Sequence, residues 1–455
     1  MSHNFIPCNQ DQLMLLSPDI RDWVDKKHLV WFVIDAVKHM DISGFYEKYR
    51  ADGKGNTAYH PLMMVTLIVY AYCNGERSSR RIQRLCGQDV AFRIITANLV
   101  PDHVTVSRFR KENRVAIENL FVEVLKLCKE AKIVKLGVVA LDGTKMAGNA
   151  SLSANRTSEA LGEEVRRILK EADEKDAEED TLYGVDKRGD ELPEELTDPK
   201  SRYIRLKECK ARLDREAAEA KEAQQQKIDE RVQKEEESGQ KPRGRKPVSA
   251  DEAVDKEAKA NVTDPDSRIM KTRSGYAQGF NAQAVATEEQ IIVSAEVTQQ
   301  ENDMHQLGPM LDSAKQTLAA AGVTEKIEAV ACDAGYFSDA NIEAYGKKGT
   351  DLYIATKKDW KQRKELKEET VLPDVVPDGL SNKEAMEHKL KTAKGKEIYA
   401  KRKIMIEPIF GQIKDCRKIR SFMMRGIESV RAEWKLICAT HNLLKLFRSG
   451  KLKFA

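Results

Sequence analysis

The first part of the chain carries apolar side chains at helical spacing. Residues 60–73 are apolar nearly all round, which predicts a buried helix. Residues 80–86 follow a pair of serines that can cap a second helix. Thr105 or Ser107 can cap a long helix to about Ala131, because its apolar residues recur at intervals of three and four. We therefore expect a helical N-terminal region.

The second pattern consists of short strands that alternate with helices. Val138 to Leu141 are apolar and end in Asp142-Gly143, which predicts a buried strand with Asp142 at its tip. The strand and helix patterns that follow cover residues 280–287, 290–298, 303–321, 328–332, 338–345, 352–356 and 383–447. Their order, three strands and then alternating helices and strands, is that of the α/β ribonuclease-H-like fold, which is the fold class we expect.

A long charged segment interrupts this order. Residues 151–269 contain runs such as REAAEAKEAQQQKIDERVQKEEE, which are rich in alanine and in both signs of charge. Such runs are typical of a solvated helix, a helical hairpin or a coiled coil. Because residues 163–262 have few large apolar side chains, we expect that they can be shortened without unfolding the core.

Composition narrows the class of protein only moderately. The 455 residues include 77 Lys and Arg against 73 Asp and Glu, so the net charge of +4 does not by itself indicate nucleic-acid binding. The N-terminus lacks a cationic start and an apolar run, and no apolar stretch reaches the roughly 20 residues that span a bilayer. Eight cysteines without a CxxC pair are typical of reduced thiols rather than a zinc site. We expect a cytoplasmic, nucleoid-associated protein.

Three acidic residues stand where this fold would bring them together. Asp142 follows the first strand, Asp333 follows the fourth, and Glu407 lies on the last long helix. Phosphoryl transfer uses two divalent cations about 4 Å apart, and Mg²⁺ prefers oxygen ligands. Each acid alone is more often a turn residue or half of a solvated pair, but the three in this order predict a Mg²⁺ site in which Mn²⁺ can substitute. Nucleophile elbows, HExxH and phosphate-binding glycine loops are absent from the sequence.

The helix around Glu407 carries cations as well. If it is continuous, Lys403, Glu407 and Lys414 lie close to one face, with Tyr399 near its edge. Cations beside a metal-binding glutamate suit a phosphate backbone along that face. Pro408 should kink the helix or start a new one just after Glu407.

Several of these segments resemble the DDE transposases of bacterial insertion sequences. The matching segments are LDGTKM, GFNAQAV, AEVTQQENDMHQLGPML, ACDAGYFS, YAKRKIMIEPIFGQIKDCRKIRSFMMRG, AYHPLMMVTLIVYAYCNGERSSRRI and PDHVTVSRFRK. The resemblance covers nearly the whole chain except its centre, and it implies Asp142, Asp333 and Glu407 as the DDE triad.

The signature of this family around the glutamate is Tyr, two residues, Arg, three residues, Glu, six residues, Lys. Tyr399, Arg402, Glu407 and Lys414 match it, but four residues separate Arg402 from Glu407, so that Lys403 is an alternative to the arginine. A second departure from many relatives is the long insert after the first catalytic strand.

Further DNA contacts are expected outside the triad. Residues 78–111 resemble a helix-turn-helix whose last helix carries Arg108, Arg110 and Lys111, although a plain helical bundle with a basic face would show the same pattern. Arg243 and Arg245, in KPRGRKP, resemble a minor-groove hook, for which a basic linker is the alternative. Related enzymes can hold a flipped base with an aromatic residue, as Trp360 could do, but a core or surface tryptophan is the other interpretation.

These inferences predict three regions and one activity. The regions are a helical N-terminal DNA-binding domain over 1–131, a ribonuclease-H-like catalytic domain over 132–150 and 270–455, and a charged helical insertion over 151–269. The resemblance implies cleavage at transposon ends and strand transfer into target DNA, with the terminal inverted repeats and the target as partners and a homodimer in the synaptic complex. A structure-specific nuclease and a transposase-derived repressor remain alternatives.

Overall fold

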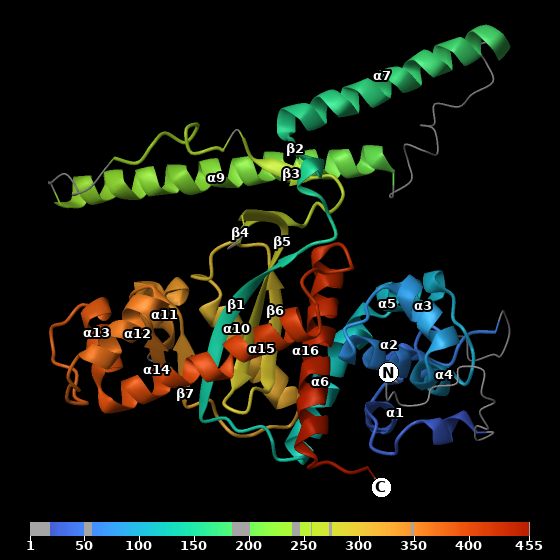
Figure 1. Cartoon of the computed structure of the whole chain (residues 1–455). Helices are drawn as coiled ribbons and strands as arrows, with labels where there is room; N and C mark the ends of the chain where they lie inside the picture. Colours follow the sequence, from blue (N-terminus) through green and yellow to red (C-terminus); the bar gives the residue numbers. More distant parts are fainter. Residues whose placement is uncertain are drawn as a thin grey trace, which may run out of the picture.

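A computed structural model describes residues 19–49, 57–183, 201–238, 246–255, 257–272, 275–346 and 350–454, with the side chains of 172–183 excepted. The chain forms a mixed α/β body with helices on both sides of a central sheet, and a helical arm that stands beyond one end of that sheet (Figure 1). We call β2 (Asn155–Thr157), α7 (Ser158–Tyr183), α9 (Arg202–Ser238) and β3 (Lys259–Asn261) the arm, and the rest the body.

The N-terminal region is helical, as its apolar pattern predicted. Its helices are α1 (Leu29–Lys38), α2 (Pro61–Cys73), α3 (Ser79–Gln88), α4 (Val90–Thr96), α5 (His103–Glu112) and α6 (Arg114–Glu130). The long helix expected from about Thr105 to Ala131 is two helices, because Asn113 leaves helical geometry and its side chain donates to the carbonyl of Phe109 at 2.8 Å. Asp102, not Thr105 or Ser107, caps α5.

The central sheet is mixed and six-stranded. It is built from β1 (Val138–Ala147), β4 (Arg268–Thr272), β5 (Gly275–Thr287), β6 (Ile292–Thr298), β7 (Ala329–Cys332) and β8 (Asp351–Ile354). The path β4-β5-β1-β7-β8 is hydrogen-bonded in that order, and β6 pairs with β5. β1 is antiparallel to β5 and parallel to β7, which is in turn parallel to β8.

Helices from the C-terminal half cover this sheet. They are α10 (Leu307–Ala320), α11 (Asp339–Tyr345), α12 (Asp359–Glu368), α13 (Asn382–Lys391), α14 (Ala393–Met405), α15 (Glu407–Gly411) and α16 (Ile427–Ser449). α14 packs on β1, β7 and β8, whereas α10 packs on β5 and β6. A π-helical turn over Gln412–Cys416 follows α15.

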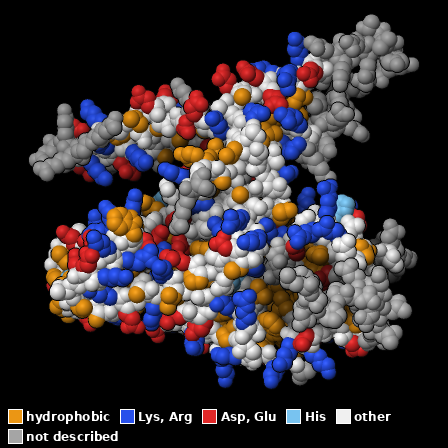
Figure 2. Space-filling model, viewed as in Figure 1, with side chains coloured by type: hydrophobic (Ala, Val, Ile, Leu, Met, Phe, Trp, Pro, Cys, Tyr) orange, Lys and Arg blue, Asp and Glu red, His pale blue; other side chains and the backbone are white. Residues whose placement is uncertain are grey.

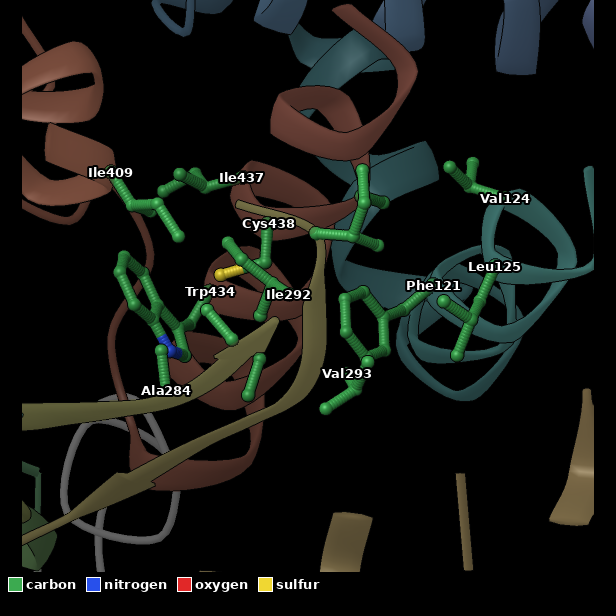
Figure 3. Close-up of a cluster of buried hydrophobic side chains, with 14 of the residues drawn as sticks. Phe121, Val124, Leu125, Ala284, Ile292, Val293, Ile409, Trp434, Ile437 and Cys438 are labelled. Carbon is green, nitrogen blue, oxygen red and sulfur yellow. The ribbon is translucent and has the colours of Figure 1, made fainter. Parts of the chain in front are cut away.

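One hydrophobic core joins the N-terminal helices to the sheet. α16 packs against β6 on one side and against α6 and α2 on the other. Phe121 of α6, Val293 of β6 and Trp434 of α16 belong to the same buried cluster (Figure 3). Asn442 of α16 both accepts from the amide and donates to the carbonyl of Ile292, at 2.8 Å each. The helical region thus shares its core with the sheet.

The arm has a small core of its own. Its elements are β2 (Asn155–Thr157), α7 (Ser158–Tyr183), α9 (Arg202–Ser238) and β3 (Lys259–Asn261), and β2 pairs with β3 in a separate two-stranded sheet. Its buried apolar side chains are Leu161, Leu206, Cys209, Leu213, Ala260 and Val262. The segment expected to be mostly solvated is therefore packed around a few residues near the body, while α9 extends far beyond them (Figure 1).

Candidate active site

Asp142 and Asp333 are brought together by the register of two parallel strands. The pairing of β1 with β7 ends at Leu141 and Cys332, so Asp142 and Asp333 are the next residues on neighbouring strands. The sequence analysis placed Asp142 at the tip of its strand, and this prediction was wrong. β1 continues to Ala147 because its other edge stays paired with β5 along that length.

The third acid, Glu407, stands at a break between two helices. α14 ends at Met405, Ile406 has φ −102°, and α15 begins at Glu407 with Pro408 in its first turn. The expected break at Pro408 is present, but the stretch is not one helix. In a continuous helix, Arg402 and Glu407 would point about 140° apart. The junction at Ile406 turns Glu407 back toward Arg402. The two side chains therefore meet although four residues separate them, one more than in the family signature.

The guanidinium of Arg402 lies among the carboxylates of the three predicted acids. Its Nη2 is 3.0 Å from Oδ2 of Asp142 and 4.0 Å from Oδ2 of Asp333, and its Nη1 is 3.7 Å from Oε1 of Glu407. The side chain of Arg402 is only 5% exposed. Three acids from two strands and one helix junction therefore converge on one buried cation.

Burial raises the pKa of the two aspartates at the site. Burial raises the pKa of Asp142 to about 7, with Asp333 adding to the rise and the nearby Arg402 opposing it. Burial also raises the pKa of Asp333, again against Arg402. The pKa of each aspartate rises because desolvation of a carboxyl group outweighs one cation that is shared among several acids.

A fourth acid, Asp303, supports the site from the other face of the sheet. Its Oδ1 accepts from Asn281 at 2.6 Å and from Gln283 at 2.7 Å, and it lies 3.5 Å from Nζ of Lys145. A side chain at Gly143 would collide with this network, since a Cβ there would lie 2.2 Å from the amide nitrogen of Gln283. The sequence placed Asp303 at the start of an expected helix, where an acid is ordinary, so it was missed.

A fifth acid, Asp359, also contacts Arg402. It is the first residue of α12, and its Oδ1 lies 3.5 Å from Nη1 of Arg402 and accepts from the hydroxyl of Tyr399 at 2.9 Å. This contact could not be predicted from the sequence, because Asp359 lies in a run of charged residues that is typical of a solvated surface.

Of the four residues expected to contact DNA near Glu407, three lie at the site and one lies outside it. Lys414 donates to Oγ1 of Thr144 at 2.5 Å, and Thr144 shares a face of β1 with Asp142. Tyr399 is buried at the site, and Arg402 points into it. Lys403, the expected alternative to the arginine, is exposed instead. One position along a helix changes direction by about 100°, so Arg402 and Lys403 cannot both face the acids.

The chemistry of the acids fits a hard cation, but their present arrangement is set by Arg402. Carboxylate oxygens are the ligands that Mg²⁺ prefers. Within the described ranges, no three acidic, histidine or cysteine side chains come close enough together to hold a metal ion. The physical reason is visible at the site, where the guanidinium lies between the carboxylates and compensates their charge.

In the N-terminal region, one face of α5 is exposed to solvent and carries two cations. Val104, Ser107, Arg108 and Lys111 are exposed at positions i, i+3, i+4 and i+7. Residues of α3 and α5 and Met423 line a cavity of about 580 Å³ beside this stripe.

Arg110 departs from the expectation that it contacts DNA. It is 5% exposed and donates to the hydroxyl of Tyr72 at 3.0 Å, to the carbonyl of Arg77 at 2.7 Å and to Oγ of Ser79 at 2.6 Å. Its guanidinium forms hydrogen bonds in the protein interior, because Arg110 lies on the same helical face as the buried Val106.

Two other expectations have different outcomes. Arg243 and Arg245 lie outside the described residues. Trp360 is 62% exposed, next to Asp359, and is therefore a surface residue rather than a core residue.

With this geometry in place, comparison with known families gives two matches. Residues 361–447 match the model of the transposase DDE domain, and residues 18–112 match that of a transposase domain, DUF772. Both matches support the resemblance to the insertion-sequence DDE transposases that the motifs indicated. The first match includes Arg402, Glu407 and Lys414 but not the two aspartates. No curated protein and no solved structure matched the chain.

Proposed function

We propose that this transposase cleaves DNA at the ends of an insertion sequence and joins the ends to target DNA, using Asp142, Asp333 and Glu407. The observation that carries the proposal is the convergence of these three carboxylates on Arg402. The order of strands, with β1 central and next to both β5 and β7, supports a ribonuclease-H-like core.

Two reactions of the same type would occur at this site. Water attacks the phosphorus at the transposon end, the bond from phosphorus to the 3′ oxygen breaks, and a 3′-hydroxyl is released. That hydroxyl then attacks a phosphorus of the target, forming a new ester bond and releasing a target 3′-hydroxyl. The three carboxylates would hold Mg²⁺ or Mn²⁺, which when bound supplies charge stabilisation for the attacking and leaving oxygens.

The other residues of the site would handle the DNA backbone. Tyr399, Arg402 and Lys414 lie within the site and offer donors to a phosphate. Arg108 and Lys111 on the exposed stripe of α5 would read or hold the terminal repeats. A homodimer would bring two ends together, with each copy supplying one site.

Over the described residues, no helix is both long and apolar enough to cross a bilayer.

The test compares binding and cleavage on the same DNA ends. Asp142→Asn, Asp333→Asn and Glu407→Gln keep side-chain size and remove the charge that would hold the metal. Each should reduce cleavage and strand transfer by more than about 100-fold with Mg²⁺ or Mn²⁺. Each should leave end binding in a mobility-shift assay nearly unchanged, since that affinity comes from phosphate and base contacts elsewhere.

Glu288→Gln is a matched control, because Glu288 is 40% exposed and pairs only peripherally, with Lys401 at 3.2 Å. It should cleave like the wild type. Cleavage that persists in all three site variants would contradict the mechanism. Cleavage without strand transfer would favour a nuclease, and binding without cleavage by the wild type would favour a repressor.

A further inference from the structure

The carboxylate of Asp359 is held by an unusual set of donors. The hydroxyl of Tyr399 donates to it at 2.9 Å, Nη1 of Arg402 lies 3.5 Å away, and Arg363, one helical turn further along α12, forms an ion pair with it. Tyr399 and Arg402 are three residues apart on α14, so they share a face. Two helices thus direct one hydroxyl and two guanidiniums at a single carboxylate.

This donor set suits a phosphodiester better than it suits an aspartate. Guanidiniums bind phosphate oxygens through paired donors, and a phosphodiester, like a carboxylate, presents two oxygens that share one negative charge. Burial raises the pKa of Tyr399 to about 12, so its hydroxyl remains a donor at neutral pH. Nε of Arg402 is buried and, among the described residues, has no hydrogen-bond partner, so the cation retains unused donor capacity.

The donors lie beside the three acids that we propose as the catalytic triad. The same guanidinium of Arg402 touches Asp142 and Glu407, and Nη1 of Arg363 is 3.9 Å from Oε1 of Glu407. Asp359 itself is partly exposed, with 27% of its side chain open to solvent. Figure 2 shows Lys and Arg side chains gathered over the part of the body that contains α12 and α14.

We propose that Tyr399, Arg402 and Arg363 form a binding site for one phosphodiester of a DNA strand, and that Asp359 occupies this site in the DNA-free protein. The inference rests on the proposed function, because it takes DNA as the ligand. It adds Arg363 as a DNA-binding residue. It also makes Asp359 an internal competitor that leaves its three donors when the backbone enters.

The experiment measures binding of a short mixed-sequence DNA duplex by fluorescence anisotropy, without divalent metal and over a range of salt concentrations. Asp359→Asn keeps the size of the side chain and removes its charge. It should tighten binding on the order of tenfold at low salt and steepen the slope of log K against log salt by about one, because one more cation is free to neutralise a phosphate. Arg363→Gln should weaken binding and make that slope shallower.

Glu368→Gln provides the matched control on the same helix. Glu368 is 64% exposed and, within the described part of the chain, forms its ion pair with Lys364 at 3.9 Å. It should bind like the wild type. An equal gain for Glu368→Gln would mean that any lost negative charge suffices, which would overturn the specific role of Asp359.

Two further outcomes would also overturn the proposal. The first is that Asp359→Asn binds DNA no better than the wild type while both melt at the same temperature. The second is that Asp359→Asn abolishes the rise in melting temperature that Mn²⁺ produces, which would make Asp359 a metal ligand.

The same measurements distinguish failure of the phosphate site from failure of the proposed function. If the wild type never cleaves DNA but Asp359→Asn still tightens binding, the enzymatic function fails and the phosphate site stands. If the wild type cleaves and Asp359→Asn changes nothing, only the phosphate site fails.

Discussion

Arg108 and Arg110, two positions apart on α5, face opposite environments. Arg108 is exposed in the stripe with Ser107 and Lys111, whereas Arg110 is buried. Residues two positions apart on a helix point about 200° apart, so one of the pair must face inward. The buried one is next to Tyr72, whose hydroxyl is 3.4 Å from Oε1 of the buried Glu433. Arg110 thus links the N-terminal helices to α16.

This difference predicts separate effects of two alanine substitutions. Arg110→Ala should lower the free energy of unfolding by about 2–4 kcal/mol, because it leaves the buried acceptors on Tyr72, Arg77 and Ser79 without their charged donor. Arg108→Ala should leave the melting temperature nearly unchanged and weaken binding to the transposon ends, with a weaker dependence on salt. Thermal melts and mobility shifts on both variants check this. A stable Arg110→Ala protein with normal melting would contradict the role of Arg110 in the fold.

At the scale of elements, the arm is attached to the body through few contacts. Its core around Leu161 and Leu206 is separate from the large core of the body. Its tether is polar, with Asp264 accepting from the amide of Gly426 at 3.2 Å and Asp266 from that of Ile427 at 2.9 Å. Removing the arm should therefore cost the body little buried apolar area.

We predict that the body folds when residues 158–258 are replaced by Asn-Gly. Thr157 and Lys259 are the last antiparallel pair of β2 and β3, so a two-residue hairpin turn can join them. The variant should keep one cooperative thermal transition close to that of the wild type, as followed by circular dichroism. An insoluble or non-cooperative variant would contradict this prediction. Loss of DNA binding alone would show that the arm takes part in the complex.

Paired core substitutions give a control for this separation. Leu206 in the arm and Leu125 in the body are both fully buried. Leu125→Ala should lower the main transition, with a cost of about 2–5 kcal/mol, whereas Leu206→Ala should leave the main transition unchanged. Equal shifts would mean that the arm and the body melt as one unit.

At the scale of the whole molecule, the N-terminal helices and the sheet share one hydrophobic core. α16, the last helix of the chain, packs between β6 and the pair α6 and α2. Polar contacts follow the same surface, including Lys435 with Glu118 at 2.8 Å and Arg77 with Glu433 at 3.6 Å. The buried residues of the region expected to end at residue 131 are therefore continuous with the core of the sheet.

It follows that the fragment 1–131 should not fold alone. Without α16, the apolar faces of α2 and α6 lose their cover, and a helical region without that cover should be aggregated or molten. We expect the isolated fragment to show no cooperative melt, and co-expression with residues 132–455 to restore a soluble complex. A fragment that melts cooperatively as a monomer would contradict this, and would make the N-terminal region an independent DNA-binding domain.

The sequence by itself determined the kinds of elements and singled out three acids, which the structure places around Arg402. Apolar runs and their caps predicted α2, α3, α11 and the strands β5 to β8, because local burial patterns repeat at 3.6 or 2 residues. The order of the elements and the motifs around Asp142, Asp333 and Glu407 predicted which acids to bring together.

The tertiary structure decided what those patterns leave open. Whether β1 ends at Asp142 or continues depends on its pairing with β5, and whether Arg402 or Lys403 faces the acids depends on how α14 packs on the sheet. The sequence around Asp303 and Asp359 carries no motif that indicates a functional site. Both residues reach the site through contacts between residues distant in sequence. Local periodicity fixes which face of an element is apolar, but the neighbours of each polar side chain are fixed only when the elements pack together.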